Sequence, residues 1–279
     1  MIIDCHTHIF PRDIRDNRGA YFEGEPAFRM LYESSRSRLC GAEELIRAMD
    51  EEGVDRSVVF GFPWRNPDTF RRHNDYVLDS VVRYGSRLTG FCTFCPLSPG
   101  APEEAERCLQ AGLSGIGELA VYGTDLTGDV RAAFDPVAEV ARAFDVPVML
   151  HANEPVGRAY PGKCPMTLQS VYSFIRRFPR NRIILAHWGG GIFFYCLMKQ
   201  QVREALQNTW FDTAASPYLY SQDMYAVAAG ILGADRILFG SDFPLIRPGR
   251  YFREMRESGL ADGDVQNICG GSAARLLGI

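Results

Sequence analysis

The side chains best suited to chemistry in this sequence are histidines that end short apolar runs. The chain contains five histidines, and four of them lie at such ends. His6 and His8 are two residues apart, so an extended strand would point both imidazoles to one face. His151 ends the run Val-Met-Leu-His, and His187 ends Ile-Leu-Ala-His. Imidazoles gathered in this way predict a metal site or a centre for proton transfer.

Two carboxylates lie in similar positions. Glu118 is found in Gly-Ile-Gly-Glu-Leu, and Asp242 ends Leu-Phe-Gly-Ser-Asp. With the histidines they form a ligand set for one or two divalent ions: zinc is the first expectation, and manganese, iron and nickel are the others. A bound metal lowers the pKa of its water to about 7. We expect Asp242 to take a proton from that water, and His187 to act as an acid, a base or a further ligand.

Simpler roles are open for some of these residues. His6 and His8 could be a hydrogen-bonded pair in the protein interior, and Glu118 could be a salt-bridge acceptor at the end of a strand. His73, in Arg-Arg-His-Asn, is expected on the solvated face of a helix.

Strand-like runs recur along the whole chain, and segments with helical periodicity separate them. In the segment 42–52, for example, Leu45, Ile46 and Met49 share one helical face, and Gly53 ends the helix. The spacing of roughly 30 residues is that of a strand–helix–strand unit. The strand-like runs are residues 2–8, 57–62, 88–95, 115–120, 147–152, 182–187, 209–213 and 236–241.

This alternation predicts an α/β fold, a (β/α)8 TIM barrel, as one domain over residues 1–279. The ligand set at the strand ends adds the expectation of the metal-dependent hydrolase type. In such barrels the C-terminal ends of the strands converge on one mouth, where active sites lie. Residues 10–41 separate the first two strands and match neither pattern well. A long segment at this position is expected as a loop over the active-site mouth.

Loops after the strands carry candidate substrate contacts. Their basic side chains suggest a small-molecule substrate with an anionic group, since a guanidinium binds carboxylates well. Each of these residues could equally be an ordinary loop residue. The candidates are Trp64, Arg65, Tyr122, Asn153, Arg158, Tyr160, Lys163 and Trp188.

Composition narrows the class of protein. Apolar residues make up 46% and charged residues 23% of the chain, which is ordinary for a globular protein. The formal net charge of −4 weighs against nucleic acid as a partner. No apolar run predicts a membrane span, and the N-terminus lacks the features of a signal peptide. We therefore expect a cytoplasmic protein whose eight cysteines are reduced thiols.

The strand-end residues resemble a known family in type and order: they are His6-x-His8, Glu118, His151, His187 and Gly240-Ser241-Asp242 with Pro244. This set is similar to the amidohydrolase superfamily, in particular its amidohydrolase-2 branch of aminocarboxymuconate-semialdehyde-decarboxylase-like proteins. The resemblance spans the whole chain and implies that His6, His8 and Asp242 hold one metal. It also implies that His151 and His187 serve the same ion or a second one.

The sequence departs from many members of the superfamily at the fourth strand. Those members bridge two metals through a carbamylated lysine, whereas this chain has Glu118 there. A bridging glutamate resembles the superfamily's deoxyribonuclease branch, so two ions stay possible. The decarboxylase relatives use one ion and a sixth-strand histidine as acid or base, so the resemblance allows either role for His187.

The leading expectation is a metal-dependent hydrolase in which activated water attacks a small ester, lactone or amide. The alternative is a metal-dependent, non-oxidative decarboxylase, in which His187 or Asp242 protonates the carbon that loses carbon dioxide. A third hypothesis, a barrel that only binds ligands, is disfavoured because every ligand position is present. A phosphodiesterase is disfavoured by the negative net charge of the chain. The family resemblance further implies a homodimer.

Overall fold

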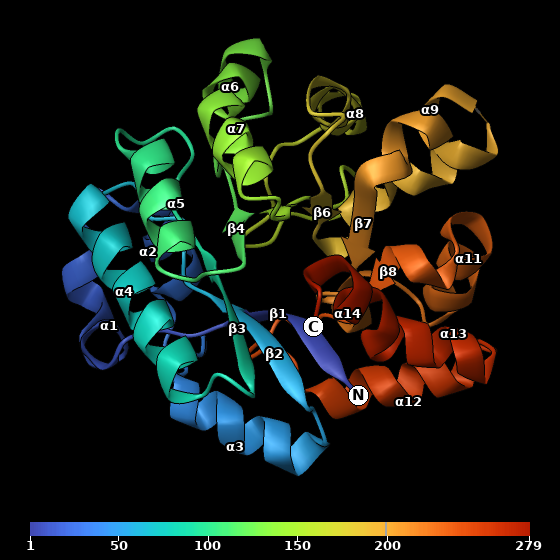
Figure 1. The fold of residues 1–279 in the computed structure, drawn as a ribbon, viewed down its shortest axis with the longest axis horizontal. Helices are drawn as coiled ribbons and strands as arrows, with labels where there is room; N and C mark the ends of the chain where they lie inside the picture. The colour runs from blue at the N-terminus through green and yellow to red at the C-terminus, as the bar shows by residue number, and fades with distance from the viewer. Residues whose placement is uncertain (199) are drawn as a thin grey trace.

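The computed structural model describes residues 1–198 and 200–279. In these residues eight parallel strands follow one another in sequence order around a barrel (Figure 1). The predicted (β/α)8 barrel is confirmed. The strands are β1 (Ile3–His8), β2 (Arg56–Phe60), β3 (Leu88–Cys92), β4 (Gly115–Leu119), β5 (Val148–Leu150), β6 (Ile183–Leu185), β7 (Thr209–Asp212) and β8 (Ile237–Leu238).

The barrel closes where its first and last strands meet. The backbone N–H of Cys5 donates to the carbonyl oxygen of Phe239 at 2.7 Å. The backbone N–H of Asp242 donates to the carbonyl oxygen of His6 at 2.9 Å. Gly240 permits this close approach, because a Cβ atom at that position would lie 2.7 Å from the Cβ of His6. The first-strand histidines and Asp242 are therefore neighbours across the seam.

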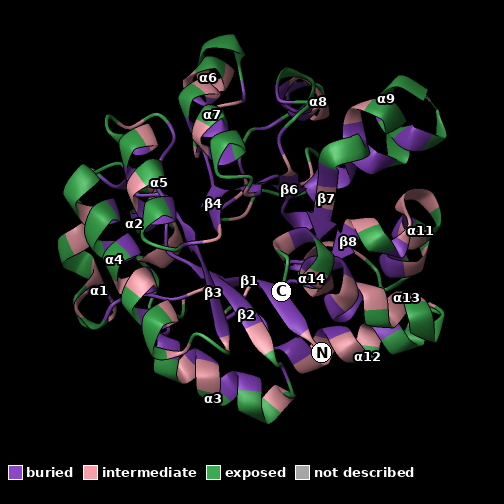
Figure 2. Cartoon of the chain, viewed as in Figure 1, coloured by how far each residue is buried: buried purple, intermediate pink, exposed green. Residues whose placement is uncertain are grey.

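Helices surround the strands, with their exposed faces outward and buried faces toward the barrel (Figure 2). The predicted helix 42–52 is confirmed as α3, which buries Leu45 and Met49 and ends at Gly53 in the left-handed region. The α-helices are α1 (Arg12–Asp16), α2 (Pro26–Tyr32), α3 (Ala42–Glu52), α4 (Pro67–Arg83), α5 (Ala101–Gln110), α6 (Gly128–Ala133), α7 (Asp135–Ala143), α8 (Leu168–Arg177), α9 (Gln200–Ala205), α10 (Ser216–Leu219), α11 (Asp223–Leu232), α12 (Pro248–Glu257), α13 (Asp262–Gln266) and α14 (Ser272–Leu277). The 3-10 and π segments are η1 (Arg18–Tyr21), η2 (His187–Leu197), η3 (Leu206–Asn208), η4 (Ala234–Arg236) and η5 (Asn267–Gly271).

Several strands are shorter than the sequence pattern indicates. Residues 147–152 and 182–187 were expected as strands, but β5 ends at Leu150 and β6 at Leu185. The polar residues that follow leave the strand ladder to turn into the mouth. His187, for example, has a left-handed backbone with φ of 52°, which a regular strand does not allow.

The segment 10–41 contains more regular structure than expected, namely α1, η1 and α2. Glu25 anchors it to the loop after β2, because its carboxylate accepts backbone N–H groups from Arg65 and Asn66, each at 2.8 Å. The guanidinium of Arg18 donates to the carbonyl oxygens of Tyr32 at 3.3 Å and Ser37 at 2.8 Å. These contacts fix the position of Tyr32 at the end of α2.

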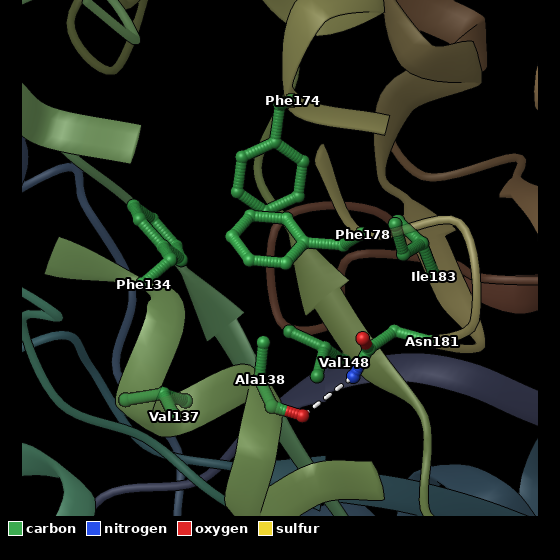
Figure 3. Close-up of a pocket in the computed structure, with 8 residues that line it drawn as sticks. All are labelled: Phe134, Val137, Ala138, Val148, Phe174, Phe178, Asn181 and Ile183. Atoms are coloured by element: carbon green, nitrogen blue, oxygen red, sulfur yellow. Dashed lines mark hydrogen bonds between the residues drawn. The ribbon is translucent and has the colours of Figure 1, made fainter. Parts of the chain in front are cut away.

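Outside the barrel, a cavity of about 10 Å³ lies between α7, α8 and the adjoining strands β5 and β6 (Figure 3). Its lining is mainly apolar, and the Asn181 amide donates to the carbonyl oxygen of Ala138 at 2.7 Å. It has room for about one water molecule, so it is a packing defect rather than a substrate site.

Among the described residues, no helix is long and apolar enough to cross a bilayer.

The expectation of a solvated His73 is wrong, since its side chain is only 1% exposed. Its Nδ1 accepts the indole N–H of Trp64 at 2.8 Å, and its Nε2 lies 2.6 Å from the carbonyl oxygen of Ile9. The proton must therefore reside on Nε2 in the neutral ring. Burial lowers the pKa of His73 from 6.5 to about 4.

We predict that His73 makes the fold sensitive to acid. Because its folded-state pKa lies below its unfolded value, the stability contribution is present above pH 6.5 and is lost as the pH falls toward 4. The loss between pH 7 and pH 4 should be about 3 kcal/mol. Urea unfolding of the wild type and His73→Gln across this range measures it. Equal pH slopes for the two proteins would contradict the prediction.

Candidate metal centre

Six predicted donor side chains meet at the mouth of the barrel. They form three overlapping groups in which the donor atoms lie within 4.8 Å of one another: His6, His8 and Glu118; His6, His187 and Asp242; and Glu118, His151 and His187. The Oδ1 atom of Asp242 lies 3.4 Å from His8 Nε2 and 3.7 Å from His6 Nε2. Donor atoms around one metal ion are separated by comparable distances, since each lies about 2 Å from the ion.

The protein fixes the orientation of three of these imidazoles from behind. The Nδ1 of His6 lies 2.8 Å from Oδ2 of Asp212, that of His8 lies 3.0 Å from the carbonyl oxygen of Gly61, and that of His187 lies 3.1 Å from the carbonyl oxygen of Ala214. We assign the proton to Nδ1 in each ring, because all three neighbours accept hydrogen bonds. Each Nε2 lone pair then points toward the cluster, as in many metal sites.

One atom tests whether a metal fits. His6 Nε2 is completely buried and has no hydrogen-bond partner among the described residues. A buried polar atom without a partner is costly. A cation between His6, His8 and Asp242 would satisfy it, so the donors present fit a divalent metal.

Glu118 turns its two oxygens toward different neighbours. Its Oε2 lies 3.8 Å from His6 Nε2 and 3.9 Å from His8 Nε2. Its Oε1 lies 3.0 Å from His151 Nδ1 and 3.4 Å from His187 Nε2. The residue before Glu118 must be glycine, because a Cβ atom at Gly117 would overlap the carbonyl oxygen of Met149. The geometry therefore accommodates one ion or two.

The charges of the cluster favour a cation at its centre. Burial alone would raise the pKa of Asp242, but the His8 hydrogen bond and the nearby His6 and His187 lower it to about 2. Burial opposes the ionised form of Glu118 too, yet His151 and His6 hold its pKa well below the usual range. Conversely, burial would lower the pKa of His6, but Asp212 and Glu118 raise it to about 10. A metal ion would take the place of the protons that these carboxylates attract.

The predicted aromatic contacts occupy different environments. Trp64 and Trp188 are both fully buried, and the Trp188 indole N–H donates to Ser216 at 2.6 Å. Tyr122 is half-buried, and its ring centroid lies 5.6 Å from that of His151. The Tyr122 ring packs on a donor imidazole, while the two tryptophan rings pack on other side chains, Trp64 on His73 and Trp188 on Phe193 and Tyr225. Substrate contact stays a prediction for all of them.

Three of the predicted polar contacts after β5 bind other groups of the same loop. Lys163 Nζ lies 3.0 Å from Glu154 Oε1, and the Tyr160 hydroxyl donates to the same carboxylate at 2.9 Å. Asn153 is buried and bonds to the backbone of Cys164. These contacts order the loop. Arg65 and Arg158 are exposed, and their role in anion binding stays a prediction.

Two residues near the cluster were missed by the sequence analysis. Asp212 is fully buried and accepts the backbone N–H of His187 at 2.9 Å, in addition to the His6 imidazole. Its position at the end of β7 is the same signal that singled out the other donors. Tyr32 comes from α2, where no sequence pattern connects it with the barrel mouth.

The curated relatives that match this chain are decarboxylases, and so are several of the solved structures that resemble it. Gamma-resorcylate decarboxylase of Polaromonas sp. is 25% identical over 293 residues, covering 87% of this chain and 89% of the relative. The structure of 5-carboxyvanillate decarboxylase from Sphingomonas paucimobilis matches with a TM-score of 0.78 at 21% identity, covering 100% of this chain and 99% of the other. Dihydroxybenzoic acid decarboxylase from Polaromonas sp. JS666, solved with manganese and the inhibitor 2-nitroresorcinol, has a TM-score of 0.72 at 20% identity and covers 99% and 96%.

The expectation of a hydrolase is wrong, because the curated relatives are decarboxylases. Activation of water and anchoring of a carboxylated substrate require the same kind of ligand set. The donor residues therefore did not distinguish the two reactions. The expectation of an enzyme with a divalent metal is supported, whereas zinc as its first choice is not.

We predict that Asp212→Asn weakens metal binding by about 10- to 100-fold, as loss of a partner behind a ligating histidine commonly does. Asp212 accepts N–H groups from His6, His187 and Ala214, and an asparagine cannot accept all of them. Chelator competition measures the affinity. Asp125→Asn is the control, because Asp125 also accepts a backbone N–H, from Leu126. Equal affinities of the two variants would contradict the prediction.

The family model described as Amidohydrolase matches residues 3–279, almost the whole chain. The match agrees with the resemblance of the strand-end residues. This chain therefore belongs to the amidohydrolase family, in its amidohydrolase-2 branch.

Proposed function

We propose that the protein is a metal-dependent, non-oxidative decarboxylase of a small aromatic carboxylate with a hydroxyl group on its ring. The similarity to gamma-resorcylate decarboxylase over 87% of the chain carries this proposal. The buried cluster of imidazoles and carboxylates supports it, because such a site can hold the oxygens of an anionic substrate.

In this proposal His6, His8, His151 and Asp242 hold the ion, and Glu118 balances its charge or completes its ligand shell. When bound, the metal supplies a Lewis acid that anchors and polarises the substrate's oxygens. The cluster is largely buried, so water has limited access to it. Exclusion of water strengthens the electrostatic interactions within the site.

We assign proton delivery to His187. Its Nδ1 is occupied by the Ala214 carbonyl oxygen, and its Nε2 faces Glu118 Oε1 at 3.4 Å. In the imidazolium form, Nε2 donates its proton to the ring carbon that bears the carboxylate. The bond between that carbon and the carboxylate then breaks, its electron pair restores the aromatic ring, and carbon dioxide leaves. The product carries hydrogen in place of the carboxylate.

We propose manganese as the ion, since decarboxylases of similar fold were solved with manganese bound. The donor set contains imidazoles and carboxylates, which manganese accepts. One ion near His6 and His8 suffices for the proposed reaction, although the two oxygens of Glu118 leave room for a second. Residues 10–41 are proposed as the cover of the mouth. A homodimer and a cytoplasmic location stay predictions.

We predict that the manganese-loaded protein releases carbon dioxide from hydroxylated benzoates such as 2,6-dihydroxybenzoate, and that chelation abolishes this activity. Mass spectrometry of the products and a carbon dioxide assay follow the reaction. Esters, lactones and amides serve as comparison substrates. Turnover of these compounds without decarboxylation of any aromatic carboxylate would contradict the proposal.

We predict that His187→Gln lowers kcat by about 10²- to 10⁴-fold, the range typical of a lost general acid. The metal content should remain that of the wild type, because the other donors hold the ion. Metal analysis alongside single-turnover kinetics separates the two roles. If the variant loses its metal in proportion to its activity, His187 is a ligand instead.

A further inference from the structure

A row of aromatic rings leads from the segment 10–41 to the donor cluster. The ring centroid of Tyr32 lies 6.0 Å from that of Phe62, and Phe62 lies 6.2 Å from Tyr122, with the last two rings nearly parallel. Tyr122 in turn lies 5.6 Å from His151. We name Tyr32, Phe62 and Tyr122 the aromatic wall. It joins the end of α2 to the loops after β2 and β4.

The wall is rigid at its base and partly open at its surface. Phe62 is 2% exposed, whereas Tyr32 and Tyr122 are half-buried. The ring of Tyr32 also packs on Phe10 and Phe28, which are completely buried. The two tyrosines therefore hold fixed positions while part of each side chain remains accessible to a ligand.

The phenol hydroxyls of Tyr32 and Tyr122 are hydrogen-bond donors at neutral pH, since the ordinary pKa of tyrosine is about 10. Within residues 1–198 and 200–279 neither hydroxyl donates a hydrogen bond to the protein, so each is a donor available to a ligand.

We propose that Tyr32 and Tyr122 are specificity-determining residues that select a substrate ring carrying an oxygen substituent beside the group held at the cluster. The rings of Tyr32 and Tyr122 pack against the substrate ring, and their hydroxyls donate to its oxygen substituent. This inference rests on the proposed function for its substrate class, but it concerns recognition rather than bond cleavage. An acyclic carboxylate would gain neither contact.

Recognition can be tested with ligands that cannot lose carbon dioxide. Salicylamide and benzamide share a ring and a carbonyl oxygen, and differ by the ring hydroxyl. Isothermal titration of the manganese-loaded protein gives both dissociation constants for the wild type, Tyr32→Phe and Tyr122→Phe. Tyr172→Phe, a half-buried tyrosine of α8, is the matched control. The tyrosine-to-phenylalanine changes retain each ring and remove one hydroxyl.

We expect Tyr32→Phe and Tyr122→Phe to weaken salicylamide binding by about three- to tenfold, the value of one hydrogen bond, with benzamide binding unchanged. Phe62→Leu should weaken the binding of both ligands, because it removes the ring on which Tyr32 and Tyr122 pack. An equal effect of the tyrosine changes on both ligands, or no effect on either, overturns the proposal. Loss of metal in either tyrosine variant also overturns it, since that result assigns the residue to the cluster's structure.

The test of Tyr32 and Tyr122 can fail or succeed independently of the proposed decarboxylation. Discrimination between the two ligands that depends on Tyr32 and Tyr122, without any decarboxylation by the wild type, refutes the decarboxylase and retains the inference. Decarboxylation with unaltered discrimination in the variants refutes the inference alone.

Discussion

Mutual repulsion among the donors at the barrel mouth is the constraint on which the site depends. Buried lone pairs and carboxylate charges that face one point are unfavourable unless a cation lies between them. The fold holds them there because each imidazole is bound from behind, with Asp212 behind His6 and a backbone carbonyl behind His8. His187 and Asp242 also have left-handed backbones, with φ of 52° and 60°. Such conformations cost free energy and persist only where the surrounding structure enforces them.

The same constraint explains why the donor residues do not determine the reaction. Imidazoles and carboxylates at strand ends give a cation site, whichever bond the enzyme breaks. Selection of the reaction depends on what surrounds that site: which group can carry a proton and which surface can hold the substrate. The proposed proton carrier, His187, follows β6, and the proposed surface for the substrate comes from Tyr32 in α2 and from the loops after β2 and β4. Loops of a barrel vary independently of its strands, so one ligand set can serve different chemistries.

Much of the architecture could be predicted from the sequence. Each of the eight predicted strand regions overlaps a strand, and the six donors lie together, because period-two patterns and strand-end positions are local signals. Local patterns could not reveal that His73 is buried against Trp64, since that environment comes from packing between α4 and the barrel. They also could not place Tyr32, whose neighbours are distant in sequence. The sequence pattern extends several strands too far, because the polar residues at their ends leave the hydrogen-bonded ladder of the sheet.

The seam between β1 and β8 has a consequence for biosynthesis. His6 and His8 leave the ribosome long before Asp242, whose N–H bonds to His6, because almost the whole barrel lies between them in the sequence. A nascent chain therefore exposes two histidines long before the carboxylate that completes their shared site exists. During that interval the first strand has no partner from the last one. Premature termination before residue 242 would leave an open sheet edge, which is a template for aggregation.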